Sequence, residues 1–168
     1  MLFPEIIDPD SGASRPWQEG ETGELVLTHL IKQAQPLIRF RTGDIITLTG
    51  VDKAECGRTA PRFRVVGRSD DMVVIRGINV FPSMLTGIVN STGALSGEYR
   101  IQLDQPPPYD FLPLEVELAN MTGDSEKLEA GLKNQITQQI GVSARVRVLP
   151  PMSLPRTAGK TKRVVKSF

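Results

Sequence analysis

A short basic segment close to the C-terminal end holds residues that could contact a phosphate. Gly159, Lys160 and Thr161 match the end of a nucleotide-binding phosphate loop, G-x-x-x-x-G-K-[ST]. The match is incomplete, because the earlier glycine falls at position 154, which is Leu154. A solvated basic terminus is the simpler interpretation. A lysine beside a small glycine could still reach a phosphate oxygen as a mobile point charge, which makes Lys160 a candidate.

A second group of candidates surrounds the tetrapeptide Arg41–Asp44. Asp44 has a simple structural interpretation as a turn residue between two strands. Its carboxylate also accepts two hydrogen bonds, so it is a natural ligand for a ribose diol. Arg41 or Arg68 could hold a phosphate or steady that carboxylate, whereas Arg68 taken alone is interpreted as a linker charge.

Two regions of different character must position these residues. Residues 1–66 are rich in β-branched and apolar runs separated by turn formers, and they predict strands without a convincing helix. Residues 67–71 (GRSDD) form a polar break, after which the order strand, helix, strand, strand, helix, strand is expected. We therefore predict an α+β protein: a small all-β subdomain at 1–66 and a compact α+β domain at 72–168 in the order β-α-β-β-α-β.

The best-defined element is a helix over residues 124–140. Asp124 or Ser125 can cap its start and Gly141 can close its end. Four aliphatic residues recur on one face, and this stripe is expected in the core: Leu128, Leu132, Ile136 and Ile140. The proline-containing tail from residue 150 onward is expected to be an extended surface segment that displays its cations.

Composition excludes several classes of protein. The 168 residues carry 20 Lys and Arg against 19 Asp and Glu, a balance that gives no reason to expect a nucleic-acid partner. The single cysteine, Cys56, leaves no intramolecular disulfide and no cysteine zinc site, and no other metal site is expected. No apolar run is long enough for a membrane span, and the N-terminus lacks signal-peptide features. A cytoplasmic location is the default expectation.

Four segments, taken together and in order, closely resemble the C-terminal portion of phenylacetate-coenzyme A ligases, which belong to the adenylate-forming acyl-CoA synthetase superfamily. The segments are Gly23–Thr28 (GELVLT), Pro36–Asp44 (PLIRFRTGD), Gly67–Pro82 (GRSDDMVVIRGINVFP) and Leu154–Val164 (LPRTAGKTKRV). The run IRGINVFP is highly specific, and the resemblance extends through essentially the whole chain.

The resemblance implies a two-step activation of a carboxylic acid. In such ligases the carboxylate attacks the α-phosphate of ATP, which releases pyrophosphate and leaves an acyl-adenylate, and the thiol of coenzyme A then displaces AMP. The C-terminal domain rotates between the steps, and a hinge lets one domain serve both. The implied small-molecule partners are the acid, ATP with Mg²⁺, and coenzyme A.

The resemblance also implies roles for individual residues around the nucleotide. Asp44 would bind the ribose hydroxyls of ATP or AMP, and Arg68 would assist at the ribose or phosphate. Arg41 would support the Asp44 turn. Asp70, within residues 67–71, would be the hinge.

Further implied roles concern the two chemical steps. Lys160 matches the catalytic lysine that contacts the α-phosphate and carboxylate during adenylation, and Lys162 is the second candidate in the same basic segment. Gly77, with its neighbour Arg76, matches the loop that lines the tunnel for the pantetheine arm of coenzyme A. The missing Cβ of Gly77 would permit close approach there.

A complete ligase also needs a phosphate loop, an acid-binding pocket and an adenine-binding segment, which normally lie upstream of the point where this sequence starts. We therefore expect a C-terminal fragment that supplies the hinge, the lysine and the coenzyme A tunnel but is inactive alone. The alternative is a non-catalytic nucleotide- or coenzyme A-binding module, or a subunit of a split ligase that joins a missing N-terminal domain or subunit. Self-association through exposed strand edges stays open.

Overall fold

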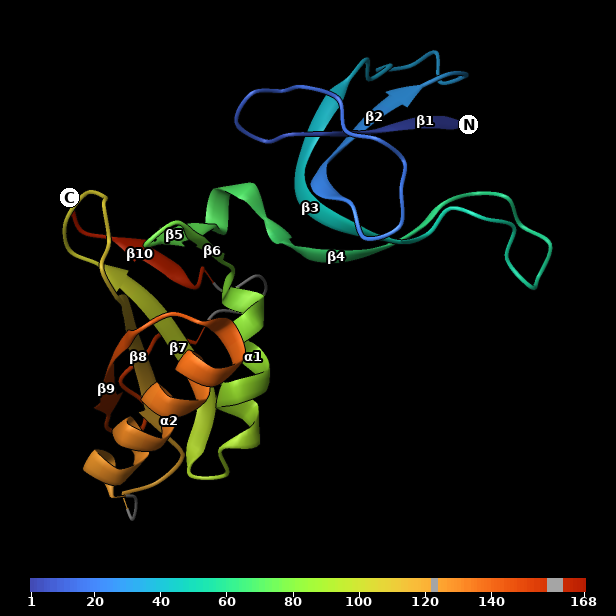
Figure 1. Ribbon diagram of the computed structural model, residues 1–168. Coiled ribbons are helices and arrows are strands. Elements are labelled where there is room, and N and C mark those ends of the chain that lie inside the picture. Colours follow the sequence, from blue (N-terminus) through green and yellow to red (C-terminus); the bar gives the residue numbers. More distant parts are fainter. Residues whose placement is uncertain (122–123, 157–161) are drawn as a thin grey trace. The chain divides into compact units, whose positions relative to one another are not determined.

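The computed structural model of the chain describes residues 1–121, 124–156 and 162–168 (Figure 1). The chain divides into two compact units, unit 1 at Met1–Asp70 and unit 2 at Asp71–Phe168. Each unit has a hydrophobic cluster of its own. The α+β class predicted from the sequence is confirmed.

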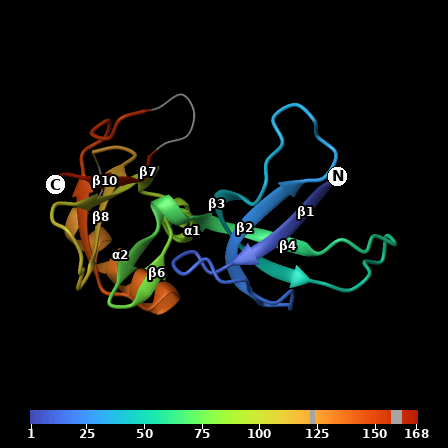
Figure 2. The ribbon, with the colours of Figure 1, turned by 90° about the horizontal axis from the view of Figure 1, so that it is seen from above.

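Unit 1 is a four-stranded antiparallel sheet in the order β1-β2-β3-β4, and Figure 2 shows these strands side by side. The strands are β1 (Leu2–Ile7), β2 (Thr22–His29), β3 (Phe40–Gly50) and β4 (Arg62–Arg68). A small cluster of buried aliphatic residues holds the sheet together: Ile6, Leu25, Ile46 and Leu48. A single 3-10 turn, Ser69–Asp71, follows β4.

The structure differs from the sequence expectation at Arg41–Asp44. This tetrapeptide is expected as a turn between strands, but it lies within β3. The pairing of β3 with β2 shifts between Arg41 and Ile45, which identifies an irregularity of the β-bulge type. Gly43 adopts a φ of +76°, a left-handed conformation that glycine accepts without strain. The tetrapeptide is therefore a bulge that sets the direction of Asp44 inside a continuous strand.

Unit 2 packs two helices against one sheet (Figure 1). Its strands in chain order are β5 (Val73–Ile75), β6 (Ile78–Val80), β7 (Leu95–Leu103), β8 (Leu112–Leu118), β9 (Ala144–Leu149) and β10 (Val164–Lys166). The helices are α1 (Pro82–Ser91) and α2 (Ser125–Ile140). The main sheet has the order β10-β7-β8-β9, and β5 and β6 form a separate hairpin.

The two faces of the central strand β8 are buried in different ways. Four of its aliphatic side chains join the apolar core with residues from both helices: Leu112, Leu114, Val116 and Leu118. The alternate residues Glu115 and Glu117 belong to the opposite face, and both are buried as well. Two glutamates are therefore buried on β8, an inner strand of the sheet.

The predicted features of the long helix are confirmed. The Asp124 carboxylate accepts a hydrogen bond from the Lys127 backbone N–H at 3.2 Å and caps the start of α2. Gly141 closes the helix with a φ of 83°. The predicted apolar stripe lies in or against the core: Leu128, Leu132, Ile136 and Ile140.

The tail differs from the extended surface segment that the sequence predicts. Val164–Lys166 forms β10 and pairs in parallel with β7, and Val164 is buried. Leu154 is buried too. The prolines and cations of the tail indicate exposure, but these aliphatic side chains join the interior of the domain. The hairpin strand β6 is also absent from the expected order.

Within residues 1–121, 124–156 and 162–168, no helix is long and apolar enough to cross a lipid bilayer.

Truncating Ile136, which is fully buried in the α2 stripe, tests the packing of α2. We expect Ile136→Ala to lower the free energy of unfolding by about 2–5 kcal/mol, because it removes buried methylene groups and leaves a cavity. The measurement is urea unfolding followed by circular dichroism at 222 nm, where helices dominate. Met121→Ala is the control, since Met121 is 76% exposed. Equal effects of the two variants would contradict the assigned packing.

Candidate functional site

Three candidate residues of unit 1 form one chain of ion pairs. The Arg68 Nη1 atom lies 3.1 Å from the Asp44 Oδ1 atom. The Arg68 Nε atom lies 2.9 Å from the Asp70 Oδ1 atom. The side chains of Asp44 and Arg68 are 37% and 40% exposed, so a dissolved ligand can reach them. The structure therefore brings together the proposed ribose ligand, its arginine and the proposed hinge residue.

Strand pairing explains why Asp44 meets Arg68. The two residues are directly opposite each other on β3 and β4, where side chains of neighbouring strands interact. Gly43 makes room for the contact, because a Cβ atom there would lie 2.8 Å from the Arg68 Nη2 atom. Gly43 thus supplies the positive φ of the bulge and also leaves room for the Arg68 guanidinium beside Asp44.

Arg41 is held by a buried glutamate that the sequence analysis missed. The Arg41 Nε atom donates to the Glu24 Oε2 atom at 3.0 Å, and this hydrogen bond raises the pKa of the Arg41 guanidinium. The Glu24 Oε1 atom accepts from the Gly43 N–H at 3.1 Å, and the Glu24 side chain is only 2% exposed. Glu24 therefore fixes both ends of the bulge before Asp44. An acidic residue inside the aliphatic strand GELVLT was the available signal.

Arg76 and Gly77 form the two-residue turn of the β5–β6 hairpin. Their φ angles are 49° and 83°, and two successive positive φ angles are typical of a type I′ turn. A Cβ atom on Gly77 would meet no described atom of the chain within 4 Å. Within this chain the turn conformation, rather than close packing, explains the glycine. The Arg76 N–H donates to the Tyr109 carbonyl oxygen at 3.1 Å, which ties the turn to a neighbouring loop.

The two candidate lysines differ in what the structure describes. Lys160 lies outside the described residues. Lys162 is described, is exposed, and comes directly before Arg163 and strand β10.

Glu117 is the second buried glutamate that sequence reasoning missed. Hydrogen bonds from the Arg156 guanidinium and from the Leu154 N–H lower the pKa of Glu117 from 4.5 to about 2, although burial acts in the opposite direction. Its signal in the sequence was the run LEVEL at Leu114–Leu118, where acids alternate with aliphatic residues in a strand. That alternation places the acids on the face opposite the apolar core.

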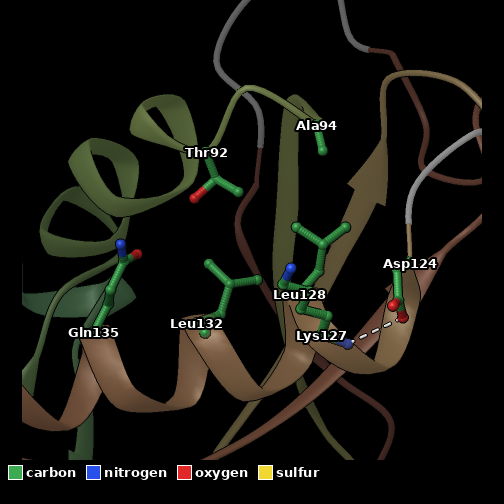
Figure 3. Close-up of a pocket in the computed structure, with 8 residues that line it drawn as sticks. Thr92, Ala94, Asp124, Lys127, Leu128, Leu132 and Gln135 are labelled. Atoms are coloured by element: carbon green, nitrogen blue, oxygen red, sulfur yellow. Dashed lines mark hydrogen bonds between the residues drawn. The ribbon is translucent and has the colours of Figure 1, made fainter.

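A pocket in unit 2 lies apart from all the candidate residues. It has a volume of about 320 Å³, and α2 and the segment after α1 line it (Figure 3). Leu128 and Leu132 supply its apolar wall and Thr92 faces them across the gap. This lining offers little chemistry beyond apolar contact.

The described part of the chain holds no group of three or more His, Cys, Asp or Glu side chains that could bind a metal ion.

Comparison with known proteins identifies the family of this chain. The family model of the AMP-binding enzyme C-terminal domain matches residues 77–167. The chain belongs to this family. In unit 2 the match runs from the Gly77 turn through β10. Asp44, Arg68 and Asp70 precede the matched residues, so their assignment depends on longer relatives of the family.

Those relatives are phenylacetate-coenzyme A ligases. The protein of Aromatoleum evansii is 40% identical over 171 residues, which cover 98% of this chain and 38% of that protein. The protein of Escherichia coli (strain K12) is 38% identical over 169 residues, covering 97% of this chain and 37% of that protein. The chain thus corresponds to the C-terminal portion of these ligases and spans less than two fifths of their length.

Solved structures of a related ligase agree with this assignment. A 2-hydroxyisobutyryl-CoA ligase in the postadenylation state, in complex with R3-HIB-AMP, is 34% identical with a TM-score of 0.83, covering 99% of this chain and 36% of that one. The same ligase has also been solved with 2-HIB-AMP and CoA in the thioesterification state, with a TM-score of 0.53 over 98% of this chain and 35% of that one.

Substitution of Gly43 tests how Asp44 is positioned. We expect Gly43→Ala to lower the free energy of unfolding by more than the roughly 1–2 kcal/mol that a left-handed alanine costs, because it also pushes Arg68 away from Asp44. Gly57→Ala is the matched control, since Gly57 has a φ of 84° but no described atom within 4 Å of the added Cβ. Chemical denaturation measures both, and equal losses would show that the close approach to Arg68 is unimportant.

Acid titration tests the Glu117 ion pair. The pKa of Glu117 is lowered on folding, so its contribution is present above pH 4.5 and is lost as the pH falls toward 2. A pKa shift from 4.5 to about 2 corresponds to about 3 kcal/mol of unfolding free energy. Between pH 6 and pH 2 we therefore expect the Glu117→Gln variant to lose up to about 3 kcal/mol less stability than the unaltered chain. Unfolding free energies between pH 6 and pH 2 provide the measurement.

Glu115→Gln is the control for the acid titration, because Glu115 lies on the same strand and face. In that variant the unfolding free energy should still fall on acidification by the amount that Glu117 contributes. The assigned cause would be wrong if Glu117→Gln and the unaltered chain lost stability in parallel as the solution is acidified.

Proposed function

We propose that this chain is the C-terminal part of an ATP-dependent, AMP-forming ligase that joins an aryl or related carboxylic acid to coenzyme A. The observation that carries the proposal is the similarity of nearly the whole chain to phenylacetate-coenzyme A ligases at 34–40% identity. The acid, ATP with Mg²⁺, and coenzyme A would be the small-molecule partners of the complete ligase. The chain supplies part of the active site and is inactive alone.

Asp44 and Arg68 are proposed to bind the nucleotide. A half-exposed carboxylate can accept hydrogen bonds from two neighbouring hydroxyl groups, which is the chemistry that a ribose diol requires. The Arg68 guanidinium orients this carboxylate from the opposite strand and can also contact a phosphate. Arg41, held by Glu24, would act indirectly through the bulge.

Asp70 is proposed as the hinge within residues 67–71, between the β subdomain at 1–66 and the mobile domain at 72–168. The boundary between the two compact units, Asp70 and Asp71, lies inside the short 3-10 turn Ser69–Asp71. Few dihedral angles need to change there for one unit to turn relative to the other. The ion pair of Arg68 with Asp70 would link the nucleotide residues to this turn.

Lys160 is proposed to stabilise the negative charge that redistributes on the α-phosphate and carboxylate during adenylation, with Lys162 as the second candidate. The role of Lys160 is supported by the match of the segment LPRTAGKTKRV to the ligase pattern. Lys162 is exposed and therefore accessible to a phosphate.

Arg76 and Gly77 are proposed to contact coenzyme A in the second step. The turn that they form is exposed, and the space in front of Gly77 contains no described atom of the chain within 4 Å of a Cβ position. A slender pantetheine arm could approach the backbone of such a turn closely.

The surface of unit 1 supports its place in a larger protein. Large apolar side chains of its sheet are exposed: Leu2, Phe3, Phe40, Phe63 and Val65. Phe63 and Val65 are two positions apart in β4 and therefore lie on the same face, and a contiguous apolar patch on such a face usually marks a surface that another protein region covers. The remaining part of a ligase, in the same polypeptide or as a separate subunit, would provide that cover.

Pyrophosphate release tests the proposed function. The 168-residue chain alone should release no pyrophosphate with phenylacetate and ATP. Joined to the upstream part of a phenylacetate-coenzyme A ligase, it should do so in an acid-dependent manner. In that complete ligase we expect Lys160→Ala to lower the adenylation rate by about 10²-fold or more, because a charge-stabilising group is lost.

Lys162→Ala is the matched variant, and the substitution that lowers the adenylation rate more identifies the catalytic lysine. Turnover by the isolated chain would overturn its description as a partial site.

Calorimetric titration of the isolated chain with AMP, ATP and coenzyme A distinguishes the proposed ligase fragment from the alternative, a non-catalytic binding module. Tight binding without any activity in the joined ligase would favour that alternative.

A further inference from the structure

Two glutamates on neighbouring strands each hold an arginine of the tail. Glu117 on β8 pairs with Arg156, and Glu98 on β7 pairs with Arg163. Only six positions, 157 to 162, separate the two arginines, and they include both candidate lysines.

The first anchor is a buried carboxylate with several donors. The Glu117 side chain is 1% exposed. Its Oε2 atom accepts from the Leu154 N–H at 2.8 Å and from the Arg156 Nη1 atom at 3.0 Å, while its Oε1 atom accepts from Arg156 Nη2. The Arg156 Nη1 atom also donates to the Leu154 carbonyl oxygen at 2.9 Å. The guanidinium thus grips both oxygens of one carboxylate and the backbone beside it, a geometry that fixes orientation.

The second anchor holds the chain where it joins β10. The Arg163 Nη1 atom lies 2.6 Å from the Glu98 Oε2 atom and donates to the Tyr99 carbonyl oxygen at 2.9 Å. The guanidinium carbon also lies 4.4 Å from the centre of the Tyr99 ring, within the range of a cation–π contact. The Ile101 N–H donates to the Arg163 carbonyl oxygen at 2.7 Å, so the backbone is attached as well.

The two pairings attach the tail to the sheet at Arg156 and at Arg163. A buried glutamate is costly to keep unless it is fully paired, and both oxygens of Glu117 are paired with groups of the tail. The pairing therefore fastens the tail at Leu154 and Arg156 to β8.

We propose that Glu117 and Glu98 are positioning residues of the ligase reaction, which hold Arg156 and Arg163, the two arginines that flank Lys160 and Lys162 in the sequence, on neighbouring strands. The inference rests on the proposed function, because it assigns the importance of the segment to its lysines. Neither glutamate touches substrate in this scheme, and each acts through its arginine.

Trypsin tests the first anchor in the 168-residue chain. Cleavage after Arg156 requires the guanidinium to leave Glu117 and enter the protease. We expect Glu117→Gln to accelerate this cleavage about 10-fold or more under native conditions, as measured by mass spectrometry of the peptide that ends at Arg156. Glu115→Gln is the control, because Glu115 pairs with Arg100 and Arg147 instead of a tail residue. An unchanged cleavage rate in Glu117→Gln would overturn the anchor.

Kinetics of the complete ligase test the positioning role. Glu117→Gln should lower kcat for adenylation about 10-fold to 100-fold, the range expected for a misplaced catalytic group, with little change in KM for ATP and the acid. A double variant with Lys160→Ala should be no slower than Lys160→Ala alone, because Glu117 acts only through the lysine segment. If Lys162 proves to be the catalytic lysine, the double variant combines Glu117→Gln with Lys162→Ala instead. Glu98→Gln is the second variant if Glu117→Gln fails to fold.

The outcomes separate this inference from the proposed function. Losses that add in the double variant would show a general structural role and overturn the positioning role, while the lysine keeps its function. Full activity of both lysine variants would overturn the proposed role of the lysines, and the positioning inference with it.

Discussion

A carboxylate that is removed from water must find positive charge and N–H donors close by, and this requirement shapes both units of the chain. Glu24 and Glu117 are almost fully buried, and each is paired with an arginine and a backbone N–H. Each pairing also fixes a piece of irregular backbone beside a candidate site residue. The buried acids therefore organise the segments in which regular strand pairing ends.

In unit 1 the buried Glu24 determines, through the bulge in β3, how Asp44 and Arg68 lie. Glu24 holds Arg41 and the Gly43 N–H, which keeps the bulge in β3. The bulge and the absent side chain of Gly43 then let Arg68 lie against Asp44. A carboxylate fixed in this way needs little reordering when a ligand arrives, so less of the binding energy is spent on conformational entropy.

Local patterns were sufficient to predict much of the fold. The stripe of α2, its Asp124 cap and its Gly141 end depend on residues within one helix, and the structure confirms them. β10 and the Arg41–Asp44 bulge were not predicted, because each depends on a partner strand distant in sequence. The pairing of Glu117 with Arg156 joins residues 39 positions apart, and composition cannot reveal such a contact. The motif match located Asp44 and Arg68, but only strand pairing shows why they meet.

The two hydrophobic clusters have a consequence for the activity of a partial ligase. Each unit builds a core from its own residues, as a domain able to fold independently does. Loss of catalysis in the isolated chain would then reflect missing chemical groups rather than failure to fold. The same independence keeps the Glu117 and Glu98 anchors intact, because both lie entirely within unit 2. The two anchors join Arg156 and Arg163 to one sheet of unit 2, so both arginines are fixed relative to that sheet.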